Sequence, residues 1–362
     1  MLRIVSVLPE VKGLPPRNFG EIATCVRDFT CRSCYRNEIE VLGGVNLSGF
    51  DIVRYEVVPS VKRYEGSMHA YASGCAKIIN DKHARLVEIH NHPHFLHLMA
   101  GRVKCRLALH LYDDPQEMDA ARTPDERHRL LEICSAVYCA TGYIRNRFME
   151  GLNKKLKKKL HVVYTGAEYP GSLPEKENII VFVGNMTEGR GAKVLAQALR
   201  IALPDLREWR AVFISSTPPC ADEPGLYEER VKQILSPLGR RAKMLGFLSR
   251  AEIRDYLARS AIAVALASRR DPLEYSVFEA MACGCALISS GRGGLREITG
   301  IAAVTLKDFS IQRLADTITM LAKDPKERAR LQGLAREHHA DSYISRSEST
   351  KGLDRVREQI LG

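Results

Sequence analysis

The chain lacks any apolar run that approaches the roughly 20 residues needed to span a bilayer as a helix. Its first residues, Met1 to Leu8, also lack the long apolar region and the small-residue cleavage site of a signal peptide. We therefore expect a cytoplasmic protein, with any membrane contact peripheral and on the inner face of the membrane.

Glycine and proline are too scarce for a collagen-like or low-complexity chain, at 26 Gly and 16 Pro among 362 residues. Hydrophobic residues make up 45% and charged residues 27%, which excludes disorder and is typical of folded soluble proteins. Because a single hydrophobic core stops growing efficiently at roughly 250–300 residues, the length predicts two domains.

A second Cys-x-x-Cys pair is also missing, so Cys31 and Cys34 have no partner pair with which to form a four-ligand zinc site. Ten cysteines without a secretion signal argue against disulfides. The pair lies beside a helical stretch, residues 22–29, where cysteine usually serves as a small core residue. We expect a structural role.

Short β-branched runs alternate with helical patterns along the chain. Near-continuous apolar runs separated by helices are typical of parallel sheets covered on both faces. The sequence therefore predicts an α/β fold with two doubly wound, Rossmann-like domains. The expected strands are 3–8, 38–42, 86–90, 105–111, 136–140 and 160–164, then 179–183, 211–215, 242–245, 261–266, 286–289 and 302–306.

The best candidate for a domain boundary is residues 168–174, which are rich in turn formers and lie between two expected strands. We expect a first domain over 1–167, a linker over 168–177 and a second domain over 178–342. The final segment, 343–362, is expected to form a helix that packs back toward the first domain. In doubly wound folds ligands bind outside the carboxyl ends of the strands, here in a central cleft, so the loops there should carry the chemistry.

The first loop of the second half joins a strand to a helix and contains Gly184, Asn185, Arg190 and Gly191. Free N–H groups at a helix N-terminus together with a cation form an anion site. Taken alone, this segment is better explained as a plain strand-to-helix turn.

A second loop, residues 267–284, carries two acidic residues eight positions apart, Asp271 and Glu279, at the start of a short helix. Both side chains can line one pocket. Two carboxylates in such a place suit sugar hydroxyls, which donate charge-assisted hydrogen bonds to them. A strand and a Gly-rich loop follow, ending at Glu297.

These motifs resemble the donor domain of retaining glycosyltransferases of the GT-B fold, family 4. That family carries Glu-x7-Glu followed by Ala-Met-Ala-x-Gly, and here Asp271 and Glu279 stand for the two glutamates. Its later Gly-Gly-x-x-Glu loop matches 293–297, its phosphate loop matches 184–191, and its nucleobase loop matches 245–249. The resemblance covers roughly 178–340 and is weaker in the first half.

The resemblance implies a hexosyltransferase that moves a sugar from a UDP- or GDP-linked donor to a glycan or glycolipid, in lipopolysaccharide or other envelope polysaccharide synthesis. No cofactor and no metal are implied. The residues implied as catalytic are Arg190, Asp271 and Tyr112. Those implied in substrate binding are Gly20, His90, His110, Asn185, Leu248, Glu274, Tyr275, Ser276, Val277 and Glu279.

Three positions depart from the family pattern. Asn185 replaces the first arginine of the phosphate loop, Leu273-Glu274 replaces Phe-Gly, and Tyr112 stands where the family has an active-site histidine. His110 lies two residues earlier and so shares a strand face with Tyr112. Two alternatives stay open: a nucleotide-sugar epimerase of the same fold, and a basic binding protein that kept the fold and lost turnover.

Metal chemistry has little support in the sequence. No Asp-x-Asp occurs, so the metal-chelated diphosphate of the other major transferase fold is not expected. His90 and His92 could share one strand face as metal ligands, but Pro93 breaks the strand there. We favour a loop that lines the cleft.

The net charge of +11 is partly local, because five lysines crowd one short segment. They are Lys154, Lys155, Lys157, Lys158 and Lys159. Either they form a solvated helix face or they contact an anionic surface, such as a lipid leaflet or a phosphorylated glycan. We expect no nucleic-acid partner, because the chain has a single Trp, no stacking aromatics in this segment and no nucleic-acid motif.

Overall fold

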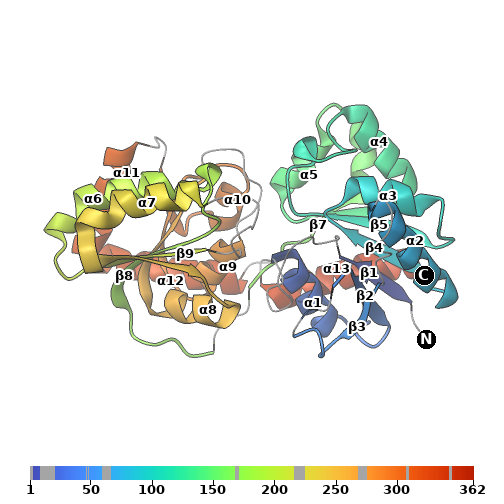
Figure 1. The fold of residues 1–362 in the computed structure, drawn as a ribbon, viewed down its shortest axis with the longest axis horizontal. Helices are drawn as coiled ribbons and strands as arrows, with labels where there is room; N and C mark the ends of the chain where they lie inside the picture. Colours follow the sequence, from blue (N-terminus) through green and yellow to red (C-terminus); the bar gives the residue numbers. More distant parts are fainter. Residues whose placement is uncertain are drawn as a thin grey trace. The chain divides into compact units, whose positions relative to one another are not determined.

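The computed structural model describes residues 3–8, 21–45, 47, 49–58, 67–167, 171–215, 225–267, 275–306, 310–341 and 345–362. Three of the expected site residues, Gly20, Asp271 and Glu274, lie outside this part, as do the first residues of the expected linker. The chain divides into two compact units (Figure 1). The first is Met1–Thr165 with Arg346–Gly362, and the second is Gly166–Ser345.

The first unit contains a seven-stranded sheet in the order β3-β2-β1-β4-β5-β6-β7, and every pair of neighbouring strands is parallel. The strands are β1 (Ile4–Val7), β2 (Ile39–Gly43), β3 (Arg54–Val57), β4 (Leu86–His90), β5 (Arg106–Leu111), β6 (Cys134–Cys139) and β7 (Leu160–Val162).

Helices of the first unit fall into two groups. On one side α1 (Glu21–Arg32) contacts the C-terminal helix α13 (Arg346–Leu361), and on the other α2 (Ser67–Asp81), α3 (Pro93–Ala100) and α4 (Pro124–Ile133) form a row. The short helix α5 (Gly142–Met149) follows β6. Helix α4 begins with the capping box that its sequence predicts, since Thr123 and Glu126 bond to each other's backbone N–H groups.

The second unit contains a six-stranded parallel sheet in the order β10-β9-β8-β11-β12-β13. Its strands are β8 (Glu177–Val183), β9 (Arg210–Ser215), β10 (Ala242–Phe247), β11 (Ser260–Ala265), β12 (Ala286–Ser289) and β13 (Ala303–Thr305). Its helices are α6 (Ala192–Ala202), α7 (Leu226–Leu235), α8 (Arg250–Arg259), α9 (Tyr275–Ala282), α10 (Leu295–Thr299), α11 (Ile311–Lys323) and α12 (Pro325–Asp341).

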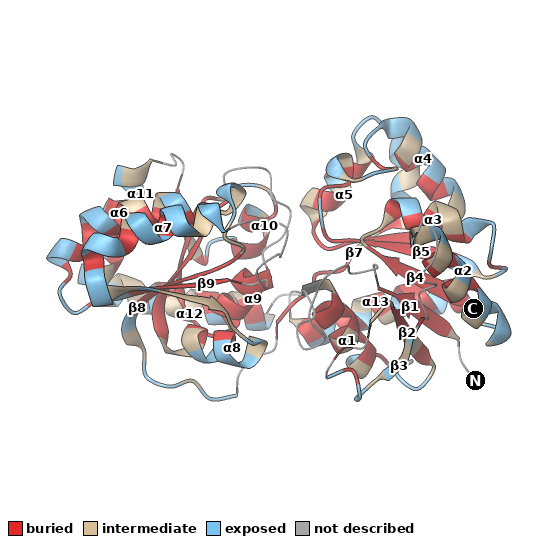
Figure 2. Cartoon of the chain, in the orientation of Figure 1, coloured by how far each residue is buried: buried red, intermediate tan, exposed pale blue. Residues whose placement is uncertain are grey.

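Burial follows the layers in both units, with buried strands and helices that expose only their outer faces (Figure 2). In the second unit α6, α7 and α11 pack together on one face of the sheet, and α8, α9 and α12 lie on the other. Helix α6 shows why: Leu195, Ala196 and Leu199 are spaced for one face and are buried against the sheet.

The architecture confirms the expected fold class of two doubly wound parallel-sheet units. The division falls after Thr165, close to the expected boundary, and α13 belongs to the first unit. Strand β3 was not expected from the sequence. Among the described residues, none of the helices is long and apolar enough to cross a membrane.

Candidate functional site

Each sheet has one point where the strand order reverses, and ligands bind outside the strand ends at such points. In the first unit the reversal lies between β1 and β4, and in the second between β8 and β11. His90 ends β4, and the loop with Asn185 and Arg190 follows β8. Most of the sequence-predicted residues that the structure describes lie at or beside these two positions, whereas Leu248 follows the edge strand β10.

In the first unit a row of aromatic rings crosses four neighbouring strands near their carboxyl ends. Register pairs His90 with His110, His110 with Tyr138 and Tyr138 with His161. The ring centroids are 4.2, 4.3 and 6.1 Å apart in that order. Parallel strands in register thus stack the two predicted histidines against each other and against a tyrosine that the sequence analysis did not identify.

Tyr112 follows β5 and is 6% exposed. Its hydroxyl oxygen lies 3.0 Å from Nδ1 of His90, within hydrogen-bond distance. Its backbone N–H donates to the side-chain oxygen of Asn91 at 3.0 Å. Burial raises the pKa of Tyr112 well above its usual value. The group therefore remains a neutral hydroxyl, which can donate or accept a hydrogen bond but cannot serve as a base.

Beneath this row lies a buried ion pair. Both carboxylate oxygens of Glu88 accept hydrogen bonds from Arg357 of α13, at 2.9 and 2.7 Å. Ser6 donates to one of these oxygens at 3.2 Å. On the neighbouring strands β5 and β6, the positions in register with Glu88 are Ala108 and Ala136. Their small side chains lie beside the bulky Glu88–Arg357 pair.

The charges of this cluster are set by its burial. Burial alone raises the pKa of a carboxyl group, but Arg357 outweighs it and holds the pKa of Glu88 well below its usual range. Burial lowers the pKa of His110 despite the opposing effect of Glu88. It also lowers the pKa of His90, which His110 lowers further. Both imidazoles are therefore neutral beside an ionised carboxylate.

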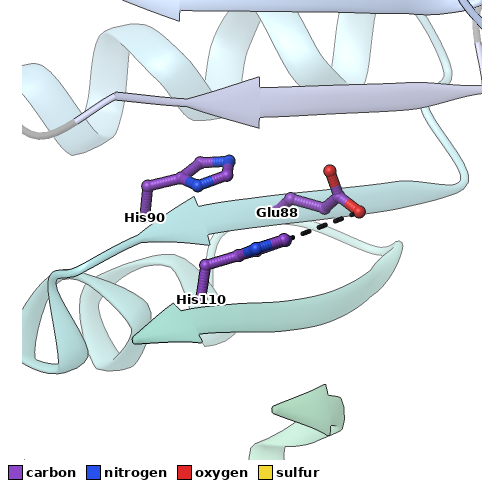
Figure 3. A group of neighbouring side chains, drawn as sticks. All are labelled: Glu88, His90 and His110. Atoms are coloured by element: carbon purple, nitrogen blue, oxygen red, sulfur yellow. Dashed lines mark ion pairs between the residues drawn. The ribbon is translucent and has the colours of Figure 1, made fainter. Parts of the chain in front are cut away.

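Glu88, His90 and His110 bring three possible metal-ligand atoms within 4.8 Å of one another (Figure 3). A ring nitrogen binds zinc in the plane of its ring at about 2.0–2.1 Å. The two imidazoles are stacked with their planes 27° apart, so both Nε2 lone pairs cannot point at one ion. Because both oxygens of Glu88 already bond to Arg357, the geometry does not favour a metal centre.

The neighbouring His92 has a structural role. His92 is the N-cap of α3, where its ring accepts from the backbone N–H of Phe95, and Pro93 is the first residue of that helix. The strand therefore ends before His92, as Pro93 predicts, and His92 does not share a strand face with His90.

In the second unit the loop after β8 leads into α6 through a single 3-10 turn, Glu188–Arg190. Gly191 then takes a left-handed conformation with φ of 74°, which glycine adopts without strain. Arg190 thus lies at the N-terminus of α6, where helix N–H groups lack intrahelical partners. The hydroxyl of Tyr227 accepts from one of them, that of Lys193, at 3.2 Å.

Helix α9 begins at the same sheet edge. The Ser276 hydroxyl donates to the carbonyl of Val183, the last residue of β8, at 2.9 Å, which ties the start of α9 to the start of the phosphate loop. Tyr275, Val277 and Glu279 are buried with it. The described residues of the two predicted loops therefore lie at one edge of the sheet. Leu248, which follows β10, is half-buried.

Sequence reasoning missed Arg250, which is the first residue of α8. Its guanidinium lies 4.0 Å from the centroid of the Tyr275 ring, and its Nη1 is 3.3 Å from Oε2 of Glu279. One signal for Arg250 was available in the sequence. It directly follows residues 245–249, the loop that was expected to contact the nucleobase. Arg357 was missed as well, since nothing in the sequence pairs it with Glu88.

Comparison with known proteins is consistent with this geometry. Residues 169–338 match the family described as "Glycosyl transferases group 1". The matched residues cover nearly the whole second unit, including the loop after β8 and helix α9.

Two curated proteins resemble part of the chain. One is "Spore coat protein SA" of Bacillus subtilis, 26% identical over 188 residues, which are 51% of this chain and 48% of that protein. The other is "Alpha-maltose-1-phosphate synthase" of Mycolicibacterium smegmatis, 25% identical over 229 residues, 57% of this chain and 58% of that protein. The chain thus spans about half the length of the curated relatives it matches.

Solved structures share the fold over the full length. Anabaena HepE in complex with UDP and glucose has a TM-score of 0.77 at 18% identity and covers 99% of both chains. Sucrose-phosphate synthase from Thermosynechococcus elongatus has a TM-score of 0.80 at 13% identity and the same coverage. Together, the two doubly wound units make up a GT-B fold.

Proposed function

We propose that the protein is a retaining, family 4-type hexosyltransferase. It moves a sugar from a nucleoside-diphosphate sugar to a glycan or glycolipid acceptor in lipopolysaccharide or other envelope polysaccharide synthesis. The observation that carries this proposal is the group 1 domain, in which buried Glu279 and the loop with Arg190 lie at one sheet edge. The complexes of HepE with UDP and glucose and with UDP-glucose support this donor class.

In this proposal the second unit binds the donor. Glu279 accepts hydrogen bonds from the ribose hydroxyls, and Asp271, outside the described residues, meets the donor sugar. Arg190 and the N-terminus of α6 stabilise the diphosphate as it leaves, which is electrostatic stabilisation of a developing charge. No metal or cofactor takes part, and no protein nucleophile is needed.

The first unit supplies the acceptor side. Tyr112 presents a neutral hydroxyl that His90 holds in place, so it positions a sugar hydroxyl by hydrogen bonding. His110 supports His90 through ring stacking. Gly20 belongs to the same proposed site but lies outside the described residues.

A panel of UDP- and GDP-linked sugars, screened by thermal shift, tests the donor assignment. A bound donor stabilises the protein by RT ln(1 + [L]/Kd), about 2.7 kcal/mol at a hundredfold excess over Kd. The selected donor is then incubated with glycan and glycolipid acceptors, with and without EDTA. Transfer that survives EDTA and retains the anomeric configuration is expected. Complete loss in EDTA that Mg²⁺ or Mn²⁺ restores would overturn the metal-free mechanism.

A basic binding protein without turnover is the second candidate, since Asn185, Glu274 and Tyr112 depart from the family pattern. It predicts a thermal shift with a donor but no transfer to any acceptor. The epimerase alternative predicts instead a change in the sugar when no acceptor is present, so the same assay separates all three.

We also propose that the protein works in the cytoplasm at the inner face of the membrane. The four lysines Lys154, Lys155, Lys157 and Lys158 are exposed. Lys159 differs, because its ammonium donates to the carbonyls of Leu131 and Cys134 at 2.6 and 3.0 Å. The proposed surface contact therefore rests on the first four lysines.

A further inference from the structure

Arg250 combines two contacts in the second unit. Its guanidinium lies 4.0 Å from the centroid of the Tyr275 ring, a cation–π distance, and its Nη1 is 3.3 Å from Oε2 of Glu279. Tyr275 and Glu279 are one helical turn apart on α9, so both present to the same side. The guanidinium of Arg250 therefore lies over the Tyr275 ring, and its Nη1 faces the Glu279 carboxylate.

The guanidinium is buried yet makes no hydrogen bond. The Arg250 side chain is 21% exposed, but its Nε, Nη1 and Nη2 atoms are all buried and lack a hydrogen-bond partner among the described residues. Its approach to Glu279 is an ion pair without hydrogen-bond geometry. A buried charged group whose donors make no hydrogen bond costs folding free energy. Such donors in a native protein need an explanation, and a bound ligand that accepts from them is one.

We propose that Arg250 is a nucleotide-binding residue that holds the ribose diol together with Glu279. This inference rests on the proposed function, in which the second unit binds a nucleoside diphosphate. A ribose hydroxyl donates one hydrogen bond and accepts others. It can therefore contact both residues at once, donating to the Glu279 carboxylate and accepting from the Arg250 guanidinium, which has no hydrogen-bond partner among the described residues.

The stacking on Tyr275 gives the pair its selectivity. It fixes the plane of the guanidinium, so that its N–H groups keep one direction relative to Glu279. A planar fork of donors held in this way is pre-organised, unlike a lysine ammonium on a flexible stem. A nucleotide without the 2′-hydroxyl leaves part of this pair unsatisfied, so the site selects ribonucleotides over 2′-deoxyribonucleotides.

Binding constants for UDP, GDP and their 2′-deoxy counterparts, measured by calorimetry, test the inference. Wild type should bind one ribonucleotide at least about 10-fold more tightly than its 2′-deoxy form. Arg250→Met should weaken that ribonucleotide about 10- to 100-fold and bring its Kd within about threefold of the 2′-deoxy value. The ribonucleotide Kd of Arg250→Lys should lie between those of wild type and Arg250→Met. This variant provides the test if Arg250→Met does not fold.

Arg254→Met is the matched control, because Arg254 is exposed one turn later on the same helix. It should change neither affinity. Equal losses of the ribo and deoxy forms in Arg250→Met, or no loss at all, would overturn the role of Arg250 while leaving the donor site in place. Failure of wild type to bind either ribonucleotide would overturn the proposed function and this inference together.

Discussion

Two imidazole rings that stay uncharged inside the first unit make the stability of the protein depend on pH. Burial lowers the pKa of His90 and of His110 below the usual value near 6.5. The unfolded chain therefore binds more protons than the native chain once the pH falls below about 7. Stability rises with pH wherever the unfolded state binds more protons, so it should fall on acidification.

We expect each of these two histidines to contribute a slope of up to about 1.4 kcal/mol per pH unit below pH 6.5. His110→Phe keeps a flat ring between His90 and Tyr138 but cannot titrate. Urea unfolding at several pH values between 5 and 8 should show a shallower slope for this variant. His69→Asn, at an exposed position, should leave the slope unchanged. A His110→Phe slope equal to that of wild type would contradict this assignment.

Arg190 should carry most of the charge neutralisation at the diphosphate, because Asn185 replaces the other family cation. The leaving diphosphate gains charge in the transition state, so the contact should appear in kcat. Removing one such pre-organised contact costs about 10²–10³-fold in rate. Arg190→Ala should therefore nearly abolish transfer, and Asn185→Arg should tighten donor binding or raise the rate. Transfer by Arg190→Ala within about threefold of wild type would show that the phosphate loop lies elsewhere.

At the scale of elements, helix α13 is fastened to the first unit along its length. Arg346 at its start pairs with Asp28 of α1, and Asp354 accepts from the Ser33 hydroxyl at 2.7 Å and from the Cys34 N–H at 2.8 Å. Arg357 reaches Glu88 in the centre of the sheet. The far end of the chain thus forms part of the core of the first unit.

Removing one partner of the Glu88–Arg357 pair should be far worse than removing both. A buried charge without its partner costs about 3–5 kcal/mol, whereas an apolar replacement of both is often close to neutral. Arg357→Met should therefore destabilise the first unit by about that amount. The double variant Glu88→Met/Arg357→Met should recover about half of the loss or more. Urea unfolding of the full chain measures both.

Arg355→Met is the matched control, since Arg355 is exposed on the same helix and should change stability by no more than about 0.5 kcal/mol. If Arg357→Met matched that control, the ion pair would not hold α13. If the double variant were less stable than Arg357→Met, packing and not the uncompensated charge would set the cost.

Elements with a strong local pattern were predictable from the sequence. Strand β12 has the expected bounds because it is a nearly unbroken apolar run. Strand β4 also has the expected bounds, although Glu88 and His90 interrupt its apolar residues. Strand β3 was missed because it is an edge strand with no buried residue, so Arg54–Val57 has no apolar pattern. Strand β6 begins two residues before the expected start, since α4 runs directly into it at Cys134 with no turn residue between them.

The site was predictable only where a motif lies within one loop. The stretch from Gly184 to Gly191 and the start of α9 are such motifs. The pairing of Glu88 with Arg357 joins residues 269 positions apart. The contact of Arg250 with Glu279 joins two separate helices. Sequence spacing shows which residues are neighbours within one helix or strand. It does not show which residues of different elements meet, so both pairs became visible only in the structure.

At the scale of the whole molecule, the net charge of +11 is the property most open to test. The exposed lysines of the segment Lys154–Lys159 lie in a 3-10 turn that precedes β7 at the edge of the first sheet. Exposed ammonium groups on such a turn remain fully hydrated, so they are attracted to an anionic surface over roughly a Debye length, about 8 Å at physiological salt. Binding of this kind weakens as salt rises.

Each basic residue near an anionic leaflet contributes about 1 kcal/mol. Reversing two charges with Lys157→Glu/Lys158→Glu should therefore weaken binding to vesicles rich in anionic lipid by about 30-fold or more, measured by co-sedimentation. Lys323→Glu/Lys326→Glu makes the same change in net charge at exposed positions of the second unit, and it should weaken binding much less. If both pairs lower binding equally, the net charge and not this segment drives the contact. Binding that ignores both reversals and salt would leave Lys154–Lys159 as a solvated turn.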